Sequence, residues 1–365
     1  MFWTRLKSAF LLKPASAHEL VGIQYLRAAA ALMVVLYHLS GMMAFPKYLG
    51  RYPMGRMFEG GNIGVDVFFC LSGFIIVYIA LDPSLRPTMG AVTFYKRRFA
   101  RIVPFMWLVV IAYAALRSEF RAFFPFWSYV RAFTLFPVGA VEPNVIWTLR
   151  HEFLFYLVFG LTFLAGARWL FVLYALSPLA LMAVGLEYGP GSGGWSELLG
   201  FLFSRVDLLF GMGVLVGVVF VKTREKWPSI TFAPLGMFAV LAVIFCLSAV
   251  WRYERTVTWQ VVVIGLLSCA ALALACVTPH VNNVIGDLGR RLGDASYCIY
   301  LTHTALVSTM LGFLAHFARG LPVDAIFGVT FLAVVVSATF LHYLVERPVV
   351  AWSQRLIFPR KIVGR

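Results

Sequence analysis

The chain has 365 residues, of which 61% are hydrophobic and 13% are charged, and its mean hydropathy is +0.85. Soluble domains carry roughly 45–50% apolar and about 25% charged residues, so this composition excludes an ordinary soluble protein. Apolar runs of 16–23 residues suit membrane helices and are too long for the strands of a membrane barrel. The sequence therefore predicts an all-α integral membrane protein.

About ten transmembrane helices are expected, bundled around a polar cavity. In chain order the expected spans are 21–43, 62–81, 102–117, 147–166, 168–187, 203–221, 232–250, 258–277, 296–315 and 325–345. A transmembrane domain would thus occupy residues 21–347, between an N-terminal tail (1–20) and a basic C-terminal tail (348–365). The apolar stretch "AFLL" in the N-terminal tail is too short for a signal peptide.

Lysine and arginine predict the orientation. Nineteen of them fall in the tails and in the loops on the same side as the tails, against nine in the opposite loops. Because cytoplasmic loops carry an excess of these residues, both termini are expected in the cytoplasm. Much of the net charge of +15 then reflects topology, and no nucleic-acid partner is implied.

The five cysteines lie in expected spans without a CxxC pattern, and no two histidines have i, i+3 or i+4 spacing. Neither a disulfide framework nor a metal site is expected.

The first span carries Arg27 and His38 in the stretch "RAAAALMVVLYH". Eleven helical residues bring the two side chains within about 20° of one helix face, about 16 Å apart along the axis. Charged groups in hydrocarbon are costly, so this face is expected to point into the bundle. Arg27 is shallow enough to reach the cytoplasmic headgroups instead, whereas His38 is too deep for that.

His38 and Glu152 lie at matching depths below the expected outer surface. An imidazole beside a carboxylate suits proton transfer, so this pair is the candidate catalytic centre. Further polar residues lie at a similar depth, where they either line the same chamber and bind substrate or form a structural ion-pair network: Asp66, Arg150, Arg205 and Asp207.

The cytoplasmic side has two candidate sites. The cluster "YKRRFAR" at residues 95–101 either anchors the protein in the membrane or binds phosphate through its guanidinium groups. In "SYCIYLTH", Tyr297 and His303 either line a path for a donor molecule or simply bond to a neighbouring helix.

Several motifs in order resemble the acyltransferase 3 family of membrane-bound acyltransferases. They are "IQYLRAAAALMVVLYH", "GVDVFFCLSGFII", "FYKRRFARIVP", "WTLRHEFLFYL", "RVDLLFGMGVLVG", "LGDASYCIYLTH" and the closing "VERP". The resemblance implies transfer of an acyl group, usually acetyl, from cytoplasmic acetyl-CoA to a carbohydrate hydroxyl, free or lipid-linked, at or beyond the outer face of a bacterial inner membrane. It implies no metal. The chain ends too early for the additional hydrolase-like domain of some relatives.

The resemblance places the family's paired arginine and histidine on Arg27 and His38, its paired arginines on Arg98 and Arg101, and its glutamate on Glu152 after Trp147. The remaining residues are candidates because of their positions in the expected spans and loops. His38 and Glu152 would be catalytic, and the donor would be bound by Arg27, Arg97, Arg98, Arg101, Tyr297 and His303. A substrate-binding or structural role would fall to Asp66, Trp147, Arg150, Tyr156, Arg205 and Asp207. One departure is that Arg150 and His151 precede the glutamate, where relatives often have small or apolar residues.

Two mechanisms stay open at this point. His38 either acts as a general base on the acceptor hydroxyl, oriented by Glu152, or forms a transient acyl-imidazole. An exopolysaccharide precursor is the expected acceptor, with lipopolysaccharide O-antigen as the alternative. The rival classes are a polysaccharide transporter or flippase and a membrane glycosyltransferase. The oligomeric state is not predicted.

Overall fold

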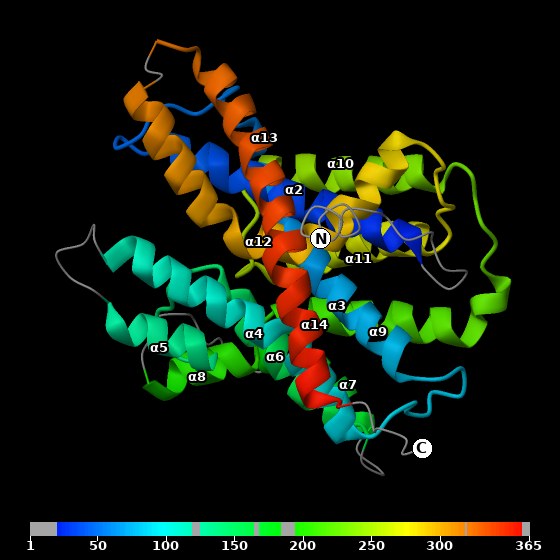
Figure 1. Ribbon diagram of the computed structural model, residues 1–365. Coiled ribbons are helices and arrows are strands. Elements are labelled where there is room, and N and C mark those ends of the chain that lie inside the picture. The colour runs from blue at the N-terminus through cyan, green and yellow to red at the C-terminus, as the bar shows by residue number, and fades with distance from the viewer. Residues whose placement is uncertain (1–19, 119–124, 164–167, 184–193, 318–319, 360–365) are drawn as a thin grey trace, which may run out of the picture. The chain divides into compact units, whose positions relative to one another are not determined.

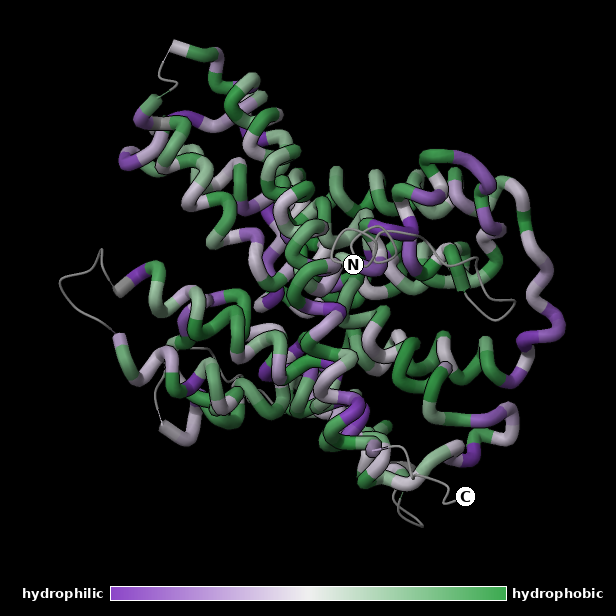
Figure 2. Tube along the Cα trace, in the orientation of Figure 1, coloured by the Kyte–Doolittle hydropathy of each residue, from purple (hydrophilic) through white to green (hydrophobic). Residues whose placement is uncertain are grey.

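The computed structural model describes residues 20–117, 125–163, 171–183, 194–314, 316–317 and 320–359, together with the helical backbone at residues 118, 168–170 and 315. Within these ranges no strand occurs, and eight segments are long and apolar enough to cross a membrane. They are Val21–Met43, Met57–Ala80, Ala91–Arg117, Gly194–Lys226, Ala233–Trp251, Thr258–Cys276, Val284–Leu314 and Val323–Ile357. Figure 2 shows that their helices are largely hydrophobic, while hydrophilic residues gather at the connections. The all-helical prediction is confirmed.

The helices expected at 147–166 and 168–187 are present in the described part of the chain. Helix α6 covers Ile146–Leu161 and α7 covers Arg168–Ala183, each with 16 residues. Neither belongs to the eight candidate spans, so a total of ten spans stays a prediction, as does the cytoplasmic placement of the termini.

The chain divides into two compact units, and Figure 1 labels the helices that belong to them. The first comprises Met1–Ile79, Pro83–Leu85 and Leu208–Tyr343, and the second comprises Ala80–Asp82, Arg86–Asp207 and Leu344–Arg365.

The first unit is built on α2 (Val21–Met43) and α12 (Val284–Phe317), which make its most extensive helix pair. Helix α13 (Val323–Leu341) packs on both, and α11 (Thr258–Cys276) packs on α2. The remaining elements of this unit are η1 (Met57–Ile63), α3 (Gly64–Ala80), most of α9 (Val206–Thr223), η2 (Arg224–Lys226) and α10 (Ala233–Trp251).

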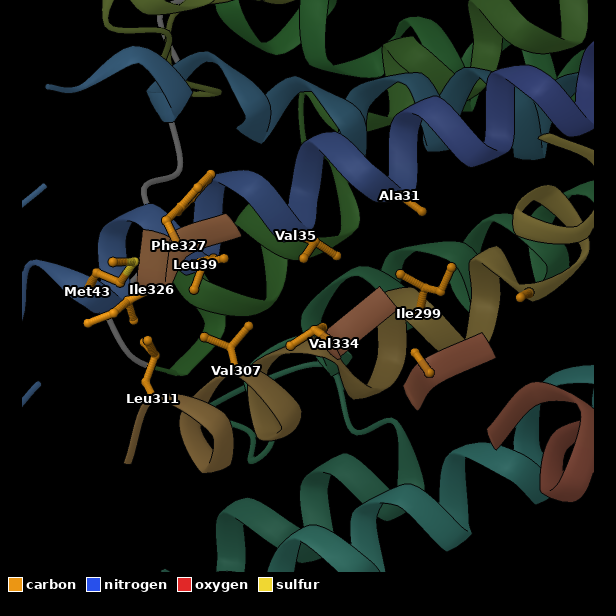
Figure 3. Close-up of a cluster of buried hydrophobic side chains, with 12 residues drawn as sticks. Ala31, Val35, Leu39, Met43, Ile299, Val307, Leu311, Ile326, Phe327 and Val334 are labelled. Atoms are coloured by element: carbon orange, nitrogen blue, oxygen red, sulfur yellow. The ribbon is translucent and has the colours of Figure 1, made fainter. Parts of the chain in front are cut away.

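Apolar side chains fill the space between α2, α12 and α13. Figure 3 shows Val35 and Leu39 of α2 near Val307 of α12 and Val334 of α13. These positions recur at the spacing of one helix face, so each helix turns a continuous apolar stripe toward the others. This packing places the inner face of α2 against α12, where the polar residues of both helices also lie.

Glycine lets α12 approach α2 closely. At Gly293 an added Cβ would collide with the backbone carbonyl of Gln24. Small residues at such crossings allow helix backbones to meet without side chains between them. The crossing therefore depends on the absence of a side chain at position 293.

The second unit contains α4 (Ala91–Ser118), α5 (Phe126–Thr134), α6, α7, α8 (Gly194–Leu202) and α14 (Arg347–Ile357). Helix α4 is its centre, because α5, α6 and α14 all pack on it. Residues 347–357, expected in the C-terminal tail, are helical and lie against α4. A π-helical turn, His342–Glu346, precedes α14.

Gly293→Ala tests the close approach. We expect it to lower the free energy of unfolding in detergent by about 1–3 kcal/mol, because the new methyl group must displace backbone. Gly312→Ala, on the same helix with no atom within 4 Å of the added Cβ, is the control and should change stability by less than about 1 kcal/mol. Equal effects of the two substitutions on an SDS unfolding titration would contradict the packing.

Candidate functional site

The first unit brings together His38 of α2 and His303 of α12. Nε2 of His303 lies 3.2 Å from Nδ1 of His38, and the ring centroids are 4.8 Å apart. His303 is completely buried, and His38 is half-buried. Two imidazoles in contact inside an apolar helix pair have a high desolvation cost, which marks them as a functional candidate.

Backbone carbonyls hold both rings. Nδ1 of His38 lies 3.0 Å from the carbonyl oxygen of Val34, and Nδ1 of His303 lies 2.6 Å from that of Tyr300. Among the described residues, no group hydrogen-bonds to Nε2 of His38. This nitrogen is therefore the group of the pair that can meet a substrate.

Arg27 lies on the same continuous helix as His38, as the sequence predicts. Its Nη1 donates a hydrogen bond to the side-chain oxygen of Gln24, 3.2 Å away. The Arg27 side chain is half-buried. The imidazole of His38 lies about three turns further along the same helix, close to the same face.

Asp66, at the start of α3, forms an ion pair, which was one of the two alternatives for this residue, but its partner was not predicted. Nη2 of Arg255 lies 2.6 Å from Oδ2 of Asp66, and Nε lies 3.1 Å from Oδ1. The Tyr253 hydroxyl donates to Oδ1 at 2.8 Å, and Arg255 also donates to the carbonyl of Asn62. Asp66 has no exposed surface, and these contacts compensate for its burial.

Arg255 lies in the loop between α10 and α11 and had been counted only as part of the orientation signal. Burial is the largest single influence on its guanidinium and lowers the pKa, but Asp66, Tyr253 and Tyr300 together raise it by more, so the net pKa lies above its ordinary value. No local pattern joins the two residues, because 189 positions separate them.

The second unit connects Glu152 with Arg98 through Tyr156. The Tyr156 hydroxyl donates a short hydrogen bond to the carboxylate of Glu152. The Arg98 guanidinium lies 5.5 Å from the centroid of the Tyr156 ring. The structure thus joins residues that the sequence analysis had assigned to opposite ends of the bundle.

Arg97 and Arg101 flank Arg98 on α4 and are both exposed. The Arg97 guanidinium lies 6.0 Å from the Phe358 ring centroid. The first turns of α4 therefore present two accessible cations and one that is partly enclosed by aromatic rings.

The contacts of Arg150 connect parts of the fold. It is buried, and its Nη2 donates to the carbonyl of Gly139 at 2.8 Å, while the Gly139 amide donates to Glu197 at 2.8 Å. Trp147, also on α6, places its ring centroid 5.9 Å from that of His151. Arg150 thus ties the segment before α6 to α8.

Asp207 is completely buried at the start of α9, and neither oxygen of its carboxylate has a hydrogen-bonding partner among the described residues. Arg205 precedes α9 and is half-buried.

In the first unit, Tyr297 is half-buried one turn before Tyr300 on α12. No group of three or more His, Cys, Asp or Glu residues suited to a metal occurs in the described parts of the chain.

The predicted site residues are divided between the two units. His38, Arg27, Asp66, Tyr297 and His303 belong to the first. The second holds Glu152, Arg97, Arg98, Arg101, Trp147, Arg150, Tyr156, Arg205 and Asp207. The pairing of His38 with Glu152 stays a prediction, whereas the contact between His38 and His303 is a finding that depth matching could not supply.

These features define a multi-pass membrane protein with a buried imidazole pair. A family model described as an acyltransferase domain, acyltransferase 3, matches residues 20–342. The chain belongs to this family, which confirms the resemblance seen in its motifs.

Three relatives illustrate the similarity. The exopolysaccharide production protein ExoZ of Rhizobium meliloti strain 1021 is 30% identical over 331 residues, covering 85% of this chain and 96% of the relative. The peptidoglycan O-acetyltransferase OatA of Listeria monocytogenes is 26% identical over 321 residues, covering 78% of this chain and 49% of the relative. The O-acetyltransferase OatA of Staphylococcus aureus strain NCTC 8325 is 28% identical over 167 residues, covering 41% and 25%. The chain thus spans about half or less of the OatA proteins. No solved structure matches the chain.

The buried ion pair generates a stability prediction. Arg255→Gln should lower the free energy of unfolding by about 3–5 kcal/mol, because it leaves the Asp66 carboxylate buried without its cation. The double variant Asp66→Asn with Arg255→Gln should recover part of this loss.

The matched control is Arg56→Gln, since Arg56 pairs with Glu59 at 3.6 Å on the surface. Its loss should cost less than about 1 kcal/mol. If thermal unfolding in detergent shows equal costs for Arg255→Gln and Arg56→Gln, the Asp66 pair does not stabilise the fold as described.

Proposed function

We propose that this protein transfers an acetyl group from cytoplasmic acetyl-CoA to a hydroxyl of an exopolysaccharide or its lipid-linked precursor, in the inner membrane of a bacterium. The observation that carries the proposal is the imidazole of His38, which is held on one side and has no hydrogen-bonding partner at Nε2 among the described residues. Membership of the acyltransferase family supports the reaction type. The similarity to ExoZ, over 96% of its length, supports exopolysaccharide as the acceptor class.

His38 acts as the general base in this proposal. Its Nε2 takes the proton of the acceptor hydroxyl as the oxygen attacks the thioester carbonyl, forming the new C–O bond. The C–S bond then breaks, and the proton passes from the imidazolium to the sulfur of the departing coenzyme. A two-step alternative passes through an acyl-imidazole at the same nitrogen. Either route requires Nε2 of His38 to be unprotonated at the start.

The donor is bound by arginine in this proposal. Arg97, Arg98 and Arg101 supply guanidinium groups that suit phosphate oxygens, and Arg27 supplies another on the face that leads to His38. Tyr297 contributes to the donor path from α12. The contact of Tyr156 with both Glu152 and Arg98 supports a role for Glu152 in holding Arg98, beside its predicted action with His38.

The test is an assay of purified protein with radiolabelled acetyl-CoA and an exopolysaccharide fragment. His38→Ala should lower the transfer rate by at least about 100-fold, because general acid–base catalysis contributes about 10²–10⁴. His316→Ala, which changes an exposed histidine near the end of α12, should keep the parental rate. Parental rates in His38→Ala would remove the catalytic assignment, and an absence of transfer by the parent protein with several glycans would remove the proposed reaction.

Two further variants separate the roles in the same assay. Arg98→Ala should raise the KM for acetyl-CoA by about tenfold, through loss of a charge-assisted hydrogen bond. Glu152→Gln should lower kcat if the carboxylate acts with His38, and should raise the same KM if it only holds Arg98. Labelled protein trapped in the absence of an acceptor would select the acyl-imidazole route.

A further inference from the structure

The histidine pair contains three contacts that restrict where its protons lie. The carbonyl oxygens of Val34 and Tyr300 can only accept hydrogen bonds. Nδ1 of His38 must therefore donate to Val34 at 3.0 Å, and Nδ1 of His303 must donate to Tyr300 at 2.6 Å. A neutral imidazole carries one ring proton, so both rings have it on Nδ1.

The third contact agrees with this assignment. Nε2 of the neutral His303 is then an acceptor, and it lies 3.2 Å from the protonated Nδ1 of His38. The Nδ1 proton of His38 is shared between this nitrogen and the Val34 carbonyl, in a three-centre hydrogen bond. The opposite assignment would turn the lone pair of Nδ1 of His38 toward the Val34 oxygen, which is repulsive.

We propose that His303 is a positioning residue, which holds His38 in the tautomer that leaves Nε2 free to take a proton. Its role is that of the carboxylate in a serine hydrolase triad, which orients the catalytic imidazole and selects its tautomer. Here the acceptor is a second, neutral imidazole. The catalytic part of this inference rests on the proposed function, whereas the tautomer follows from the contacts alone.

Two further features suit His303 to this role. It has no exposed surface, so water does not compete for its Nε2. Its own Nδ1 is bound to the backbone of α12, so the ring presents one fixed acceptor toward α2. The close crossing of the two helices at Gly293, about three turns before His303, keeps this acceptor within reach of His38.

This role differs from the binding of the donor that the sequence analysis offered for His303. A residue that lines the donor path contacts the donor and contributes to its affinity. A residue that fixes the tautomer of the base contributes to kcat and leaves the KM for the donor nearly unchanged. The two roles therefore predict different kinetic signatures.

The first experiment does not depend on enzymatic activity. Nitrogen NMR of the ¹⁵N-histidine-labelled protein in detergent, with His38→Gln used to assign the signal, reports which ring nitrogen carries the proton. We expect His38 to be a neutral imidazole protonated at Nδ1. A neutral ring protonated at Nε2, or an equal mixture of tautomers, would overturn the inference whether or not the protein transfers acetyl groups.

The second experiment compares three substitutions of His303 in the acetyl-CoA assay. His303→Leu removes the acceptor and should lower kcat by about 10- to 100-fold. His303→Asn places an amide where Nδ1 stood, keeps the bond to Tyr300, and should be as impaired as His303→Leu. His303→Gln places its amide oxygen where Nε2 stood, and should recover kcat to within about fivefold of the parent.

Two controls accompany these variants, and three outcomes would decide between the possible roles. All variants should elute as the parent does in size-exclusion chromatography, and their KM for acetyl-CoA should stay within about twofold of the parent value. A tenfold rise in KM at constant kcat would return His303 to the donor path and overturn the inference. Equal activity of the Gln and Asn variants would also overturn it, whereas an inactive parent protein with an Nδ1-protonated His38 would refute the proposed function and leave the tautomer intact.

Discussion

The structure of the first unit depends on holding two imidazoles in fixed orientations between α2 and α12. Each ring would be costly inside an apolar helix pair without hydrogen-bonding partners. The carbonyls of Val34 and Tyr300 supply partners from the same helix, and the contact between His38 and His303 joins the two helices. Close backbone approach at Gly293 and the apolar stripe around Val35 make that contact possible.

The two units handle buried charge in different ways. In the first, Asp66 is neutralised by Arg255 from a loop, and the histidine pair is bonded to backbone. In the second, Glu152, Tyr156 and Arg98 form a chain of contacts between α6 and α4. The first arrangement leaves one nitrogen of His38 without a hydrogen-bonding partner among the described residues, and the second keeps a cation near the start of α4. In the proposed acetyl transfer, the nitrogen would act as the base and the cation would bind the phosphates of acetyl-CoA.

Sequence alone predicted what depends on local hydropathy. The span 21–43 matches α2 at both ends, because its flanks are polar and its interior is apolar. The span at 296–315 was predicted too short, since α12 begins at Val284 with turns that contain Asp287, Arg290 and Arg291 and therefore fail a hydropathy criterion. The ion pair of Asp66 with Arg255 and the contact of His38 with His303 are long-range, because the partners are 189 and 265 positions apart in the sequence. Depth matching found residues at similar levels, but it could not tell which of them face each other.

The most direct test of the account is a structure of the protein with a non-hydrolysable acetyl-CoA analogue, in which the distance from the analogue's acyl carbonyl carbon to Nε2 of His38 is measured. The account predicts about 4–6 Å, which leaves room for one hydroxyl oxygen between base and carbonyl. An acyl group bound more than about 10 Å from this nitrogen, or nearer to another ionisable side chain, would contradict it.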